Sequence, residues 1–288
     1  MKDRGPLLAV DAPSLLYRAF FALPTSIADE DGHPVNALLG TVNLLLWAIE
    51  RHDPRAVVLC FGPDAATYRV ELYPRYHADR PPMPPELAQQ WARADDFFGA
   101  FGWYVEHHDS LEADDLLGSL ATAEVEAGGT ALLFTGDRDM FQCVSDRVAV
   151  LFPRGGKDGP ELIGPAEVRR RYGVDPEQVP DFIALRGDPS DGLPGAKGIG
   201  EKTAKDLLRE HGTLEAVIAA SVRLRPRIGA AVREGAEELR AFREIATLVR
   251  VPVEPPPDRT TDWLAGAAAA RGMGMRRLAQ RLERVAET

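Results

Sequence analysis

The chain has 288 residues, of which 45% are hydrophobic and 27% are charged, and its formal net charge is −10 at pH 7. It contains neither a run of about 18 apolar residues nor a signal-peptide pattern, so we exclude a helical membrane protein and expect a globular protein in the cytoplasm. The two cysteines, Cys60 and Cys143, imply no disulfide framework and no cysteine-rich zinc site.

The first half of the chain alternates strand-like and helix-like segments. Apolar runs predict strands at residues 7–10, 56–61, 103–108, 131–135 and 148–152. Apolar residues spaced three to four apart predict helices at residues 36–50, 86–101 and 112–127. This alternation predicts an α/β fold with a mainly parallel central sheet flanked by helices.

The second half is predicted to be helical. From Pro165 onward strand-like runs largely vanish, and a short helix is expected at residues 176–186. An extended connector is expected at residues 251–257, before a last helix near residues 275–286. The boundary lies at about residues 155–175, so we predict an α/β domain at 1–174 and a helical region with a C-terminal tail at 175–288.

Acidic residues follow several of these elements. Asp11 follows the first strand and Asp137 and Asp139 follow the fourth, at the strand ends where open α/β sheets bind ligands. Five further acids lie at a helix start and before a glycine-rich turn: Glu112, Asp114, Asp115, Asp188 and Asp191.

Each acidic pair alone also fits an ordinary helix start or polar turn, but their joint occurrence favours a site. On the helix, Glu112 and Asp115 share a face and Asp114 is turned away from them. Carboxylates are hard oxygen ligands, which suit Mg²⁺ or Mn²⁺. Because eight of them are more than one ion requires, they predict two metal ions. Such ions would neutralise part of the negative charge, so the net charge leaves a nucleic-acid partner open.

The glycine-rich turn runs from Gly195 to Gly200 and precedes a basic helix that begins Glu201-Lys202-Thr203. Small residues allow a helix N-terminus and backbone N–H groups to approach a phosphate closely. The nucleotide-binding P-loop is a rival interpretation, but it requires lysine directly after the second glycine and a strand upstream. Here Glu201 intervenes and a helix is expected upstream, so we interpret the turn as half of a helix-hairpin-helix DNA clamp.

Three motifs carry a resemblance to a known family. The segments LEADDLLGSLA, TGDRDMFQCVSD and GDPSDGLPGAKGIGEKTA occur in this order downstream of Asp11. Together they resemble the bacterial 5′-nuclease family of flap endonucleases and 5′-3′ exonucleases, which includes the N-terminal exonuclease domain of DNA polymerase I. The resemblance covers about residues 6–250. No polymerase sequence follows, so we expect a stand-alone protein.

The resemblance implies a PIN-like nuclease core, a helical arch at about residues 72–100 and a helix-three-turn-helix clamp on duplex DNA. It implies a monomeric, nucleoid-associated nuclease of replication or repair that acts on 5′ flaps, nicks or 5′ overhangs, alongside other replication or repair proteins. One metal would be lined by Asp11, Glu112, Asp114 and Asp137, and a second, more open one by Asp139, Asp188 and Asp191. Asp115 matches another carboxylate of the family, for which the resemblance does not fix whether it contacts a metal directly. The implied catalytic residues are Asp11, Asp137 and Asp139, with Arg69 and Arg80.

The resemblance also implies DNA contacts. Tyr17 and Arg18 would bind a terminal nucleotide, although packing of Tyr17 within a helix is an equal alternative. The glycine-rich turn would hold the DNA backbone, with a K⁺ ion coordinated by its carbonyls. The DNA-binding residues expected on this basis are Tyr17, Arg18, His77, Lys197, Gly198, Gly200, Lys202, Thr203 and Lys205.

Two positions depart from the family pattern. Gly62 stands where the family has an aspartate after the second strand, and Asp64 or a water molecule is a candidate to fill that gap. His77 stands where the arch has a lysine, and a neutral imidazole would neutralise phosphate charge poorly. These departures leave open the alternative of a non-catalytic binder of branched DNA. A further alternative, independent of them, is an RNA-cleaving enzyme on a similar fold with an acidic pocket.

Overall fold

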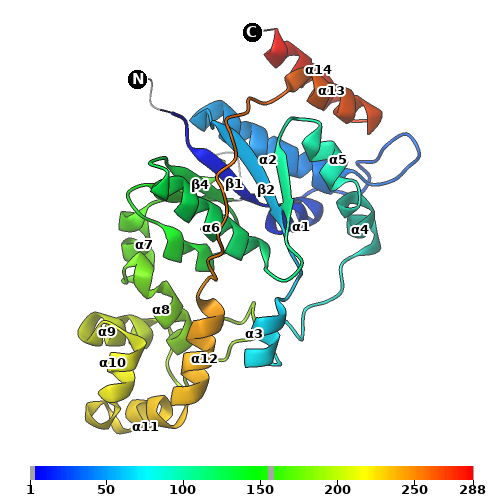
Figure 1. Ribbon diagram of the computed structural model, residues 1–288. Coiled ribbons are helices and arrows are strands. Elements are labelled where there is room, and N and C mark those ends of the chain that lie inside the picture. Colours follow the sequence, from blue (N-terminus) through cyan, green and yellow to red (C-terminus); the bar gives the residue numbers. More distant parts are fainter. Residues whose placement is uncertain (1–3, 155–158, 288) are drawn as a thin grey trace.

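A six-stranded sheet lies at the centre of the protein, for which a computed structural model describes residues 4–154 and 159–287 (Figure 1). The strands are β1 (Leu7–Asp11), β2 (Ala56–Phe61), β3 (Tyr104–His107), β4 (Ala131–Phe134), β5 (Val148–Phe152) and β6 (Glu161–Ile163). Their order is β3-β2-β1-β4-β5-β6, in which the first five strands are parallel and β6 is antiparallel to β5. The predicted α/β fold with a mainly parallel sheet is therefore confirmed.

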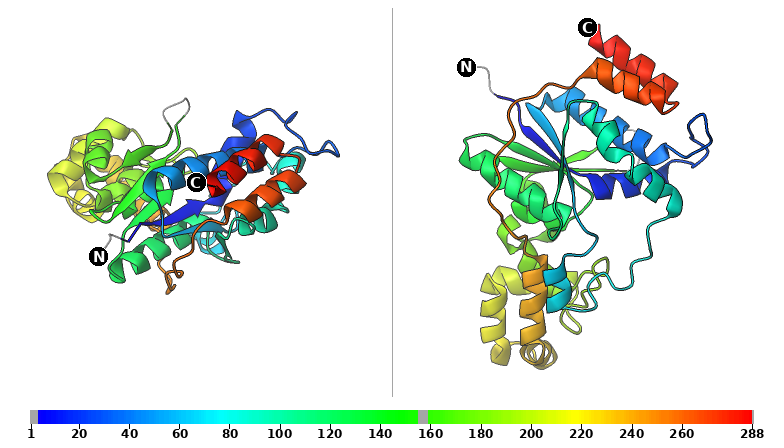
Figure 2. Two further views of the ribbon diagram at one scale, coloured as in Figure 1. Left: turned by 90° about the horizontal axis from the view of Figure 1, so that it is seen from above. Right: turned by 45° about the vertical axis from the view of Figure 1, so that its right-hand side comes forward.

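Helices cover both faces of this sheet (Figure 2). One face packs on α1 (Ala12–Ala22), α2 (Asn36–His52), α4 (Pro85–Trp91), α5 (Ala94–Gly99), α13 (Trp263–Gly272) and α14 (Arg276–Ala286). The other packs on α6 (Ala113–Glu126), the 3₁₀ helix η1 (Asp139–Cys143), α7 (Pro165–Tyr172) and α8 (Val179–Arg186). Neighbouring strand residues such as Leu7 and Leu8 enter opposite cores, because successive side chains of a strand point to opposite faces. Burial on both faces explains why the central strands are continuous apolar runs.

A helical lobe lies beyond α8, at the lower end of Figure 1. It contains η2 (Pro176–Gln178), α9 (Glu201–His211), α10 (Leu214–Ala219), η3 (Ser221–Arg223), α11 (Pro226–Glu234) and α12 (Ala236–Ala246). The short helix α3 (Thr67–Leu72) lies beside α12, and the rings of Tyr73 and Phe242 meet there at 5.1 Å. The lobe therefore contacts both the sheet domain and the segment that leads toward the predicted arch.

An extended strap, residues 247–262, returns the chain from this lobe along α6 to the helical hairpin α13–α14 (Figure 1). Hydrogen bonds from Val249 N to Asp115 and from Val251 N to Ser119 Oγ hold the strap on α6. Farther along, the buried Arg55 side chain donates to the Pro256 carbonyl at 2.6 Å and also pairs with Glu124. The strap thus ties the helical lobe to the opposite end of the sheet.

The predicted elements differ from the observed ones in several places. The single helix expected at 86–101 is divided into α4 and α5 by a turn at Ala92 and Arg93. The expected helical arch at 72–100 is helical only in these two helices, because its first part forms turns and then an extended, proline-rich stretch at residues 80–84. The sequence analysis did not predict β6 or α13. Within the described residues, every helix is too short or too polar to cross a bilayer.

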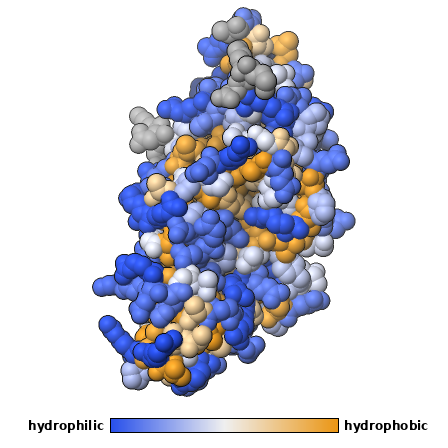
Figure 3. Space-filling view, turned by 60° about the vertical axis from the view of Figure 1, so that its left-hand side comes forward, coloured by the Kyte–Doolittle hydropathy of each residue, from blue (hydrophilic) through white to orange (hydrophobic). Residues whose placement is uncertain are grey.

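The surface is mixed in character. On the face drawn in Figure 3, patches of apolar side chains alternate with hydrophilic ones. The exposed large hydrophobic residues, among those the structure describes, come from four separate segments: Phe21, Leu162, Val222 and Leu264. Of these only Phe21 borders the cavity described next.

Candidate active site

A cavity of about 1150 Å³ opens at the carboxyl ends of the strands, beside the point where β1 lies between β2 and β4. This is the switch point of the sheet, where connections leave in opposite directions and open a crevice. Seven of the eight predicted carboxylate residues line the cavity: Asp11, Glu112, Asp114, Asp137, Asp139, Asp188 and Asp191. The acids identified from separate motifs are therefore brought together, except Asp115.

Two strand ends supply the first acids. Asp11, the last residue of β1, accepts hydrogen bonds from Ser14 N at 2.9 Å and from the Thr135 hydroxyl at 2.6 Å. The same hydroxyl oxygen accepts from Asp137 N at 2.9 Å, and the Asp137 carboxylate accepts from Asp139 N at 2.8 Å. Thr135 therefore connects the acid of β1 with the acids that follow β4, a role that the sequence analysis missed.

The start of α6 supplies Glu112 and Asp114, and it directs Asp115 elsewhere. Arg69 donates to Glu112 and to Asp115 at 2.8 and 2.9 Å, so these two acids do share a face. Asp115 is fully buried and also accepts from Val249 N, outside the cavity. Asp114, which the sequence analysis expected to be turned away from its neighbours, is the residue that lines the cavity with Glu112. The assignment of Asp115 to the metal-binding acids stays a prediction. Its oxygens accept from three protein donors, Arg69, Tyr68 and Val249.

The turn between α8 and α9 supplies the last two acids. Asp188 accepts from Ser190 N at 2.9 Å and pairs with Arg186 at 3.0 Å. One oxygen of Asp191 lies 3.2 Å both from His77 Nε2 and from a terminal nitrogen of Arg80. Residues of the predicted arch therefore reach the cavity and contact an acid that is distant in sequence.

Burial raises the pKa of several of these carboxyl groups. Burial, which is the larger cause, and repulsion from Asp191 raise the pKa of Asp137 to about 7. Burial also raises the pKa of Asp11, although hydrogen bonds from Thr135 and Ser14 oppose the increase. The pKa values of Asp114 and Asp139 are raised well above their usual range by burial and by neighbouring carboxylates. The cavity thus concentrates more negative charge than its own cations neutralise.

Gly62, which follows β2, has no room for a side chain. A Cβ atom at this position would lie 2.3 Å from the Leu111 carbonyl oxygen and 2.9 Å from Ala113 N. Asp64, the candidate to fill this gap, also lines the cavity, and its exposed carboxylate pairs with Arg80 at 3.1 Å. The chain has therefore closed the space beside Gly62 with the start of α6.

We predict that Gly62→Asp does not restore a functional carboxylate. Overpacking against backbone atoms is expected to reduce the free energy of unfolding by about 1–3 kcal/mol. Urea denaturation of the variant and of Asp64→Asn, an exposed control, measures this loss. Unchanged stability together with tighter Mg²⁺ binding by Gly62→Asp would contradict the prediction.

Aromatic side chains border the mouth of the cavity. Tyr17 packs edge-on against Trp91 with a centroid distance of 6.4 Å and lies 6.5 Å from Phe21, which is exposed. Tyr17 therefore both packs within its helix and lines the cavity, so the two interpretations are compatible. Arg18 is exposed and is not among the lining residues.

The glycine-rich turn lies between two helices, since α8 precedes it and α9 follows it. A helix upstream excludes the P-loop. Gly187 and Gly195 both have positive φ, and a Cβ on Gly195 would lie 2.3 Å from Gly187 N, so the turn requires glycine there. Beside Gly200, which precedes α9, a Cβ would meet nothing within 4 Å.

The cations of the clamp differ in availability. Lys197 and Lys202 are exposed, and Thr203 lies in the first turn of α9. Lys205, however, donates to the Arg171 carbonyl at 2.7 Å and pairs with Glu201 at 2.5 Å, so it joins α9 to α7. A phosphate contact of Lys205 stays a prediction. Arg227 of α11, which the sequence analysis did not select, lies near Gly198.

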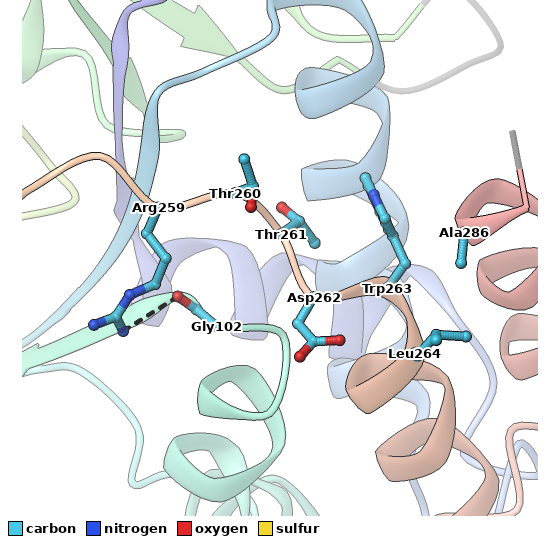
Figure 4. Close-up of a pocket in the computed structure, with 8 residues that line it drawn as sticks. All are labelled: Gly102, Arg259, Thr260, Thr261, Asp262, Trp263, Leu264 and Ala286. Carbon is cyan, nitrogen blue, oxygen red and sulfur yellow. Dashed lines mark hydrogen bonds between the residues drawn. The ribbon is translucent and has the colours of Figure 1, made fainter.

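A second hollow, of about 570 Å³, lies where the strap meets α13 (Figure 4). The Arg259 guanidinium lies 4.0 Å from the centre of the Tyr104 ring and reaches the Gly102 carbonyl. Among the described residues, Asp262 is the only carboxylate residue lining this hollow, so it lacks the convergence of acids seen in the first cavity.

The comparison with protein families matches most of the chain. The family described as "5'-3' exonuclease, N-terminal resolvase-like domain" matches residues 6–173, and "5'-3' exonuclease, C-terminal SAM fold" matches residues 174–261. DNA polymerase I of Mycobacterium tuberculosis (strain H37Rv) is 39% identical over 266 residues, which cover 91% of this chain. A thermostable DNA polymerase I of Thermus thermophilus is 39% identical over 246 residues, or 85% of this chain. The chain spans 29% of the length of each of these relatives.

Solved structures share the fold. A structure of T5 5′-exonuclease with bound zinc superposes with a TM-score of 0.68 at 17% identity and covers 96% of both chains. The catalytic core of Rad2 in complex with a DNA substrate gives a TM-score of 0.62 at 14% identity, covering 97% of this chain and 93% of Rad2. Human GEN1 bound to Holliday junction DNA gives 0.62 at 14% identity, covering 94% of this chain and 68% of GEN1.

Proposed function

Because the chain belongs to the 5′-3′ exonuclease family of DNA nucleases, we propose that it hydrolyses phosphodiesters at 5′ ends and 5′ flaps of DNA with divalent metal ions. The observation that carries this proposal is the convergence of seven carboxylate residues in one cavity from β1, β4, α6 and the turn after α8. Its class is metal-assisted hydrolysis, since these side chains offer oxygen ligands but no nucleophile paired with a base.

The residues present fit divalent ions. Every donor in the group is a carboxylate. Burial is the larger cause of the raised pKa of Asp114 and Asp139, and repulsion from neighbouring carboxylates is the second. Asp11, Glu112, Asp114 and Asp137 would hold one ion, and Asp139, Asp188 and Asp191 would hold the other. Mg²⁺ or Mn²⁺ bound there would supply the charge that activates water and stabilises the phosphodiester transition state. T5 5′-exonuclease binds divalent metal ions in a structure of the same fold.

The chain's own side chains would orient the substrate and the ligands. Thr135 and Ser14 fix the orientation of the Asp11 carboxylate at the cavity wall by hydrogen bonds. Tyr17 and Phe21 at the mouth offer ring faces on which a base of a 5′ flap would stack. Arg80, with its side chain 36% exposed, would exchange its pairing with Asp64 for a phosphate oxygen.

A clamp on the duplex completes the proposal. The turn from Gly195 to Gly200 would approach a phosphate with its backbone, while Lys197 and Lys202 neutralise the neighbouring charges. Coordination of a K⁺ ion by carbonyls of this turn is part of the same proposal. Rad2, of the same fold, was solved in complex with a DNA substrate. We also propose that the two domains meet at residue 174, that the protein is a monomer, and that it works alongside replication or repair proteins.

We expect Lys197→Ala/Lys202→Ala to weaken duplex binding and to reduce the salt dependence of binding. Each lost phosphate contact lowers the slope of log K against log salt by about 1. Fluorescence anisotropy with a labelled nicked duplex at several salt concentrations measures both quantities. A matched control is Arg271→Ala/Arg277→Ala on the exposed surface of the C-terminal hairpin, which should leave the slope unchanged.

A non-catalytic binder of branched DNA is the second candidate, favoured by the closed space beside Gly62. A 5′-labelled flap on nicked duplex DNA, incubated with Mg²⁺, with Mn²⁺ and with EDTA, separates the two functions. Release of short 5′ fragments with either ion and none with EDTA supports the nuclease. Binding without cleavage under every condition would refute it. A matched RNA flap tests whether RNA is also cut.

A further inference from the structure

The His77 side chain is held rigidly at the wall of the cavity. It is 3% exposed, and its ring stacks on Tyr76 with a centroid distance of 3.8 Å. Its backbone has a φ of 54°, unusual for a residue other than glycine, and its N–H donates to the Asp191 carbonyl. The positions of its two ring nitrogens are therefore set by the surrounding structure.

These two nitrogens face different acceptors. Nδ1 lies 2.6 Å from the Asp64 carbonyl oxygen, which can only accept, so Nδ1 carries a hydrogen. In a neutral ring Nε2 then presents its lone pair, and it lies 3.2 Å from one carboxylate oxygen of Asp191. A lone pair and a carboxylate oxygen at this distance repel each other unless a positive charge lies beside both.

Two charges meet this requirement. Arg80 supplies one in the metal-free protein, because a terminal nitrogen of its guanidinium lies 3.2 Å from the same Asp191 oxygen. A divalent ion held by His77 Nε2 and Asp191 would supply the other. Donation from the second ring nitrogen to a backbone carbonyl is also the usual arrangement of a metal-binding histidine.

We propose that His77 Nε2 and Asp191 jointly bind a divalent ion, so that the more open metal position has a nitrogen ligand. This inference rests on the proposed function, which assigns Asp191 to that position. Imidazole favours transition metals over Mg²⁺, so the site selects Mn²⁺ among the two ions considered. Arg80 approaches the same Asp191 oxygen, but its partly exposed side chain also pairs with Asp64 and can retain that contact when it moves away.

Another histidine must be distinguished in the test. Asp29, Asp31 and His33 have ligand atoms within 4.8 Å of one another, but this group is largely exposed. The Asp29 carboxylate is engaged by Arg93 at 2.9 Å and by the backbone N–H groups of Asp31 and His33. His33→Gln is therefore the matched control for His77→Asn, and asparagine suits the left-handed backbone at residue 77.

The experiment is pulsed EPR of Mn²⁺ bound to the full chain without DNA, which detects coupling to a ligand ¹⁴N nucleus. We expect the coupling in the wild type and in His33→Gln, and its loss in His77→Asn. By calorimetry, His77→Asn should weaken Mn²⁺ binding about tenfold or more while changing Mg²⁺ binding much less. Circular dichroism and thermal melting confirm that both variants are folded.

Coupling that is absent from the wild type, or that disappears in His33→Gln and persists in His77→Asn, overturns the proposal. Flap cleavage is measured separately on the same samples. Cleavage without nitrogen coupling rejects the histidine ligand and leaves the nuclease intact. Coupling without cleavage retains the ligand and rejects the nuclease.

Discussion

Replacement of Asp139 by Asn is expected to abolish metal-dependent flap cleavage while DNA affinity is retained. Asp139 is buried beside Asp137, and burial and neighbouring carboxylates raise its pKa well above the usual range. An ion that these residues share contributes several kcal/mol to transition-state stabilisation, and each 1.4 kcal/mol is a factor of ten in rate. We therefore expect kcat to fall by about 10³-fold or more in single-turnover assays.

The same substitution should not destabilise the metal-free protein. Asparagine keeps the shape of the side chain and removes one of several buried like charges, so the melting temperature without metal is expected to be equal or higher. Asp146→Asn, an exposed substitution seven positions along the chain, should leave both cleavage and melting unchanged. Full cleavage by Asp139→Asn would remove this residue from the proposed metal site. Loss of DNA binding would point to a structural role instead.

The strand-terminal acids were predictable from sequence for a local reason. Asp11 follows a run of buried apolar residues, and Asp137 follows another, so each marks the carboxyl end of a strand. That the two strands are neighbours is not encoded locally, because the order β3-β2-β1-β4 results from how distant segments pack. The family resemblance supplied this link before the structure confirmed it.

Helix phase alone does not say which face of α6 borders the cavity, although Glu112 and Asp115 share a face as predicted. Successive helical residues differ by about 100° in direction, so Asp114 and Asp115 cannot both face one cavity. Which of them faces the cavity depends on how α6 lies on the sheet, and on Arg69 and Val249, which contact Asp115 from distant parts of the chain. The contact of Lys205 with the Arg171 carbonyl of another helix is likewise set by packing that the local sequence does not reveal. The residues that the sequence analysis missed, Thr135 among them, act through hydrogen bonds that no local pattern reveals.

Arg69→Met is expected to reduce the free energy of unfolding by about 3–5 kcal/mol, because removal of one partner leaves buried charges unpaired. The Arg69 side chain is 3% exposed and donates to Glu112, to Asp115 and to the Ile245 carbonyl at the end of α12. It therefore joins α3, the start of α6 and the helical lobe in one buried network. Arg69 also lines the cavity, and its contact with Glu112 holds that acid there, so the catalytic role implied by the resemblance stays a prediction.

Arg80→Met provides the matched comparison, because it removes the same charge from the other predicted catalytic arginine. Its side chain is 36% exposed and pairs with the exposed Asp64 as well as with the buried Asp191, so we expect a smaller loss than for Arg69→Met. Urea denaturation of both variants measures stability, and cleavage under conditions where both remain folded measures function. If Arg80→Met were the more destabilising, or if Arg69→Met kept wild-type stability, Arg69 would not hold the network together. We instead expect the larger loss of stability for Arg69→Met, because Arg69 is buried and supports the metal-binding acids. Arg80 is more exposed and is available to the substrate.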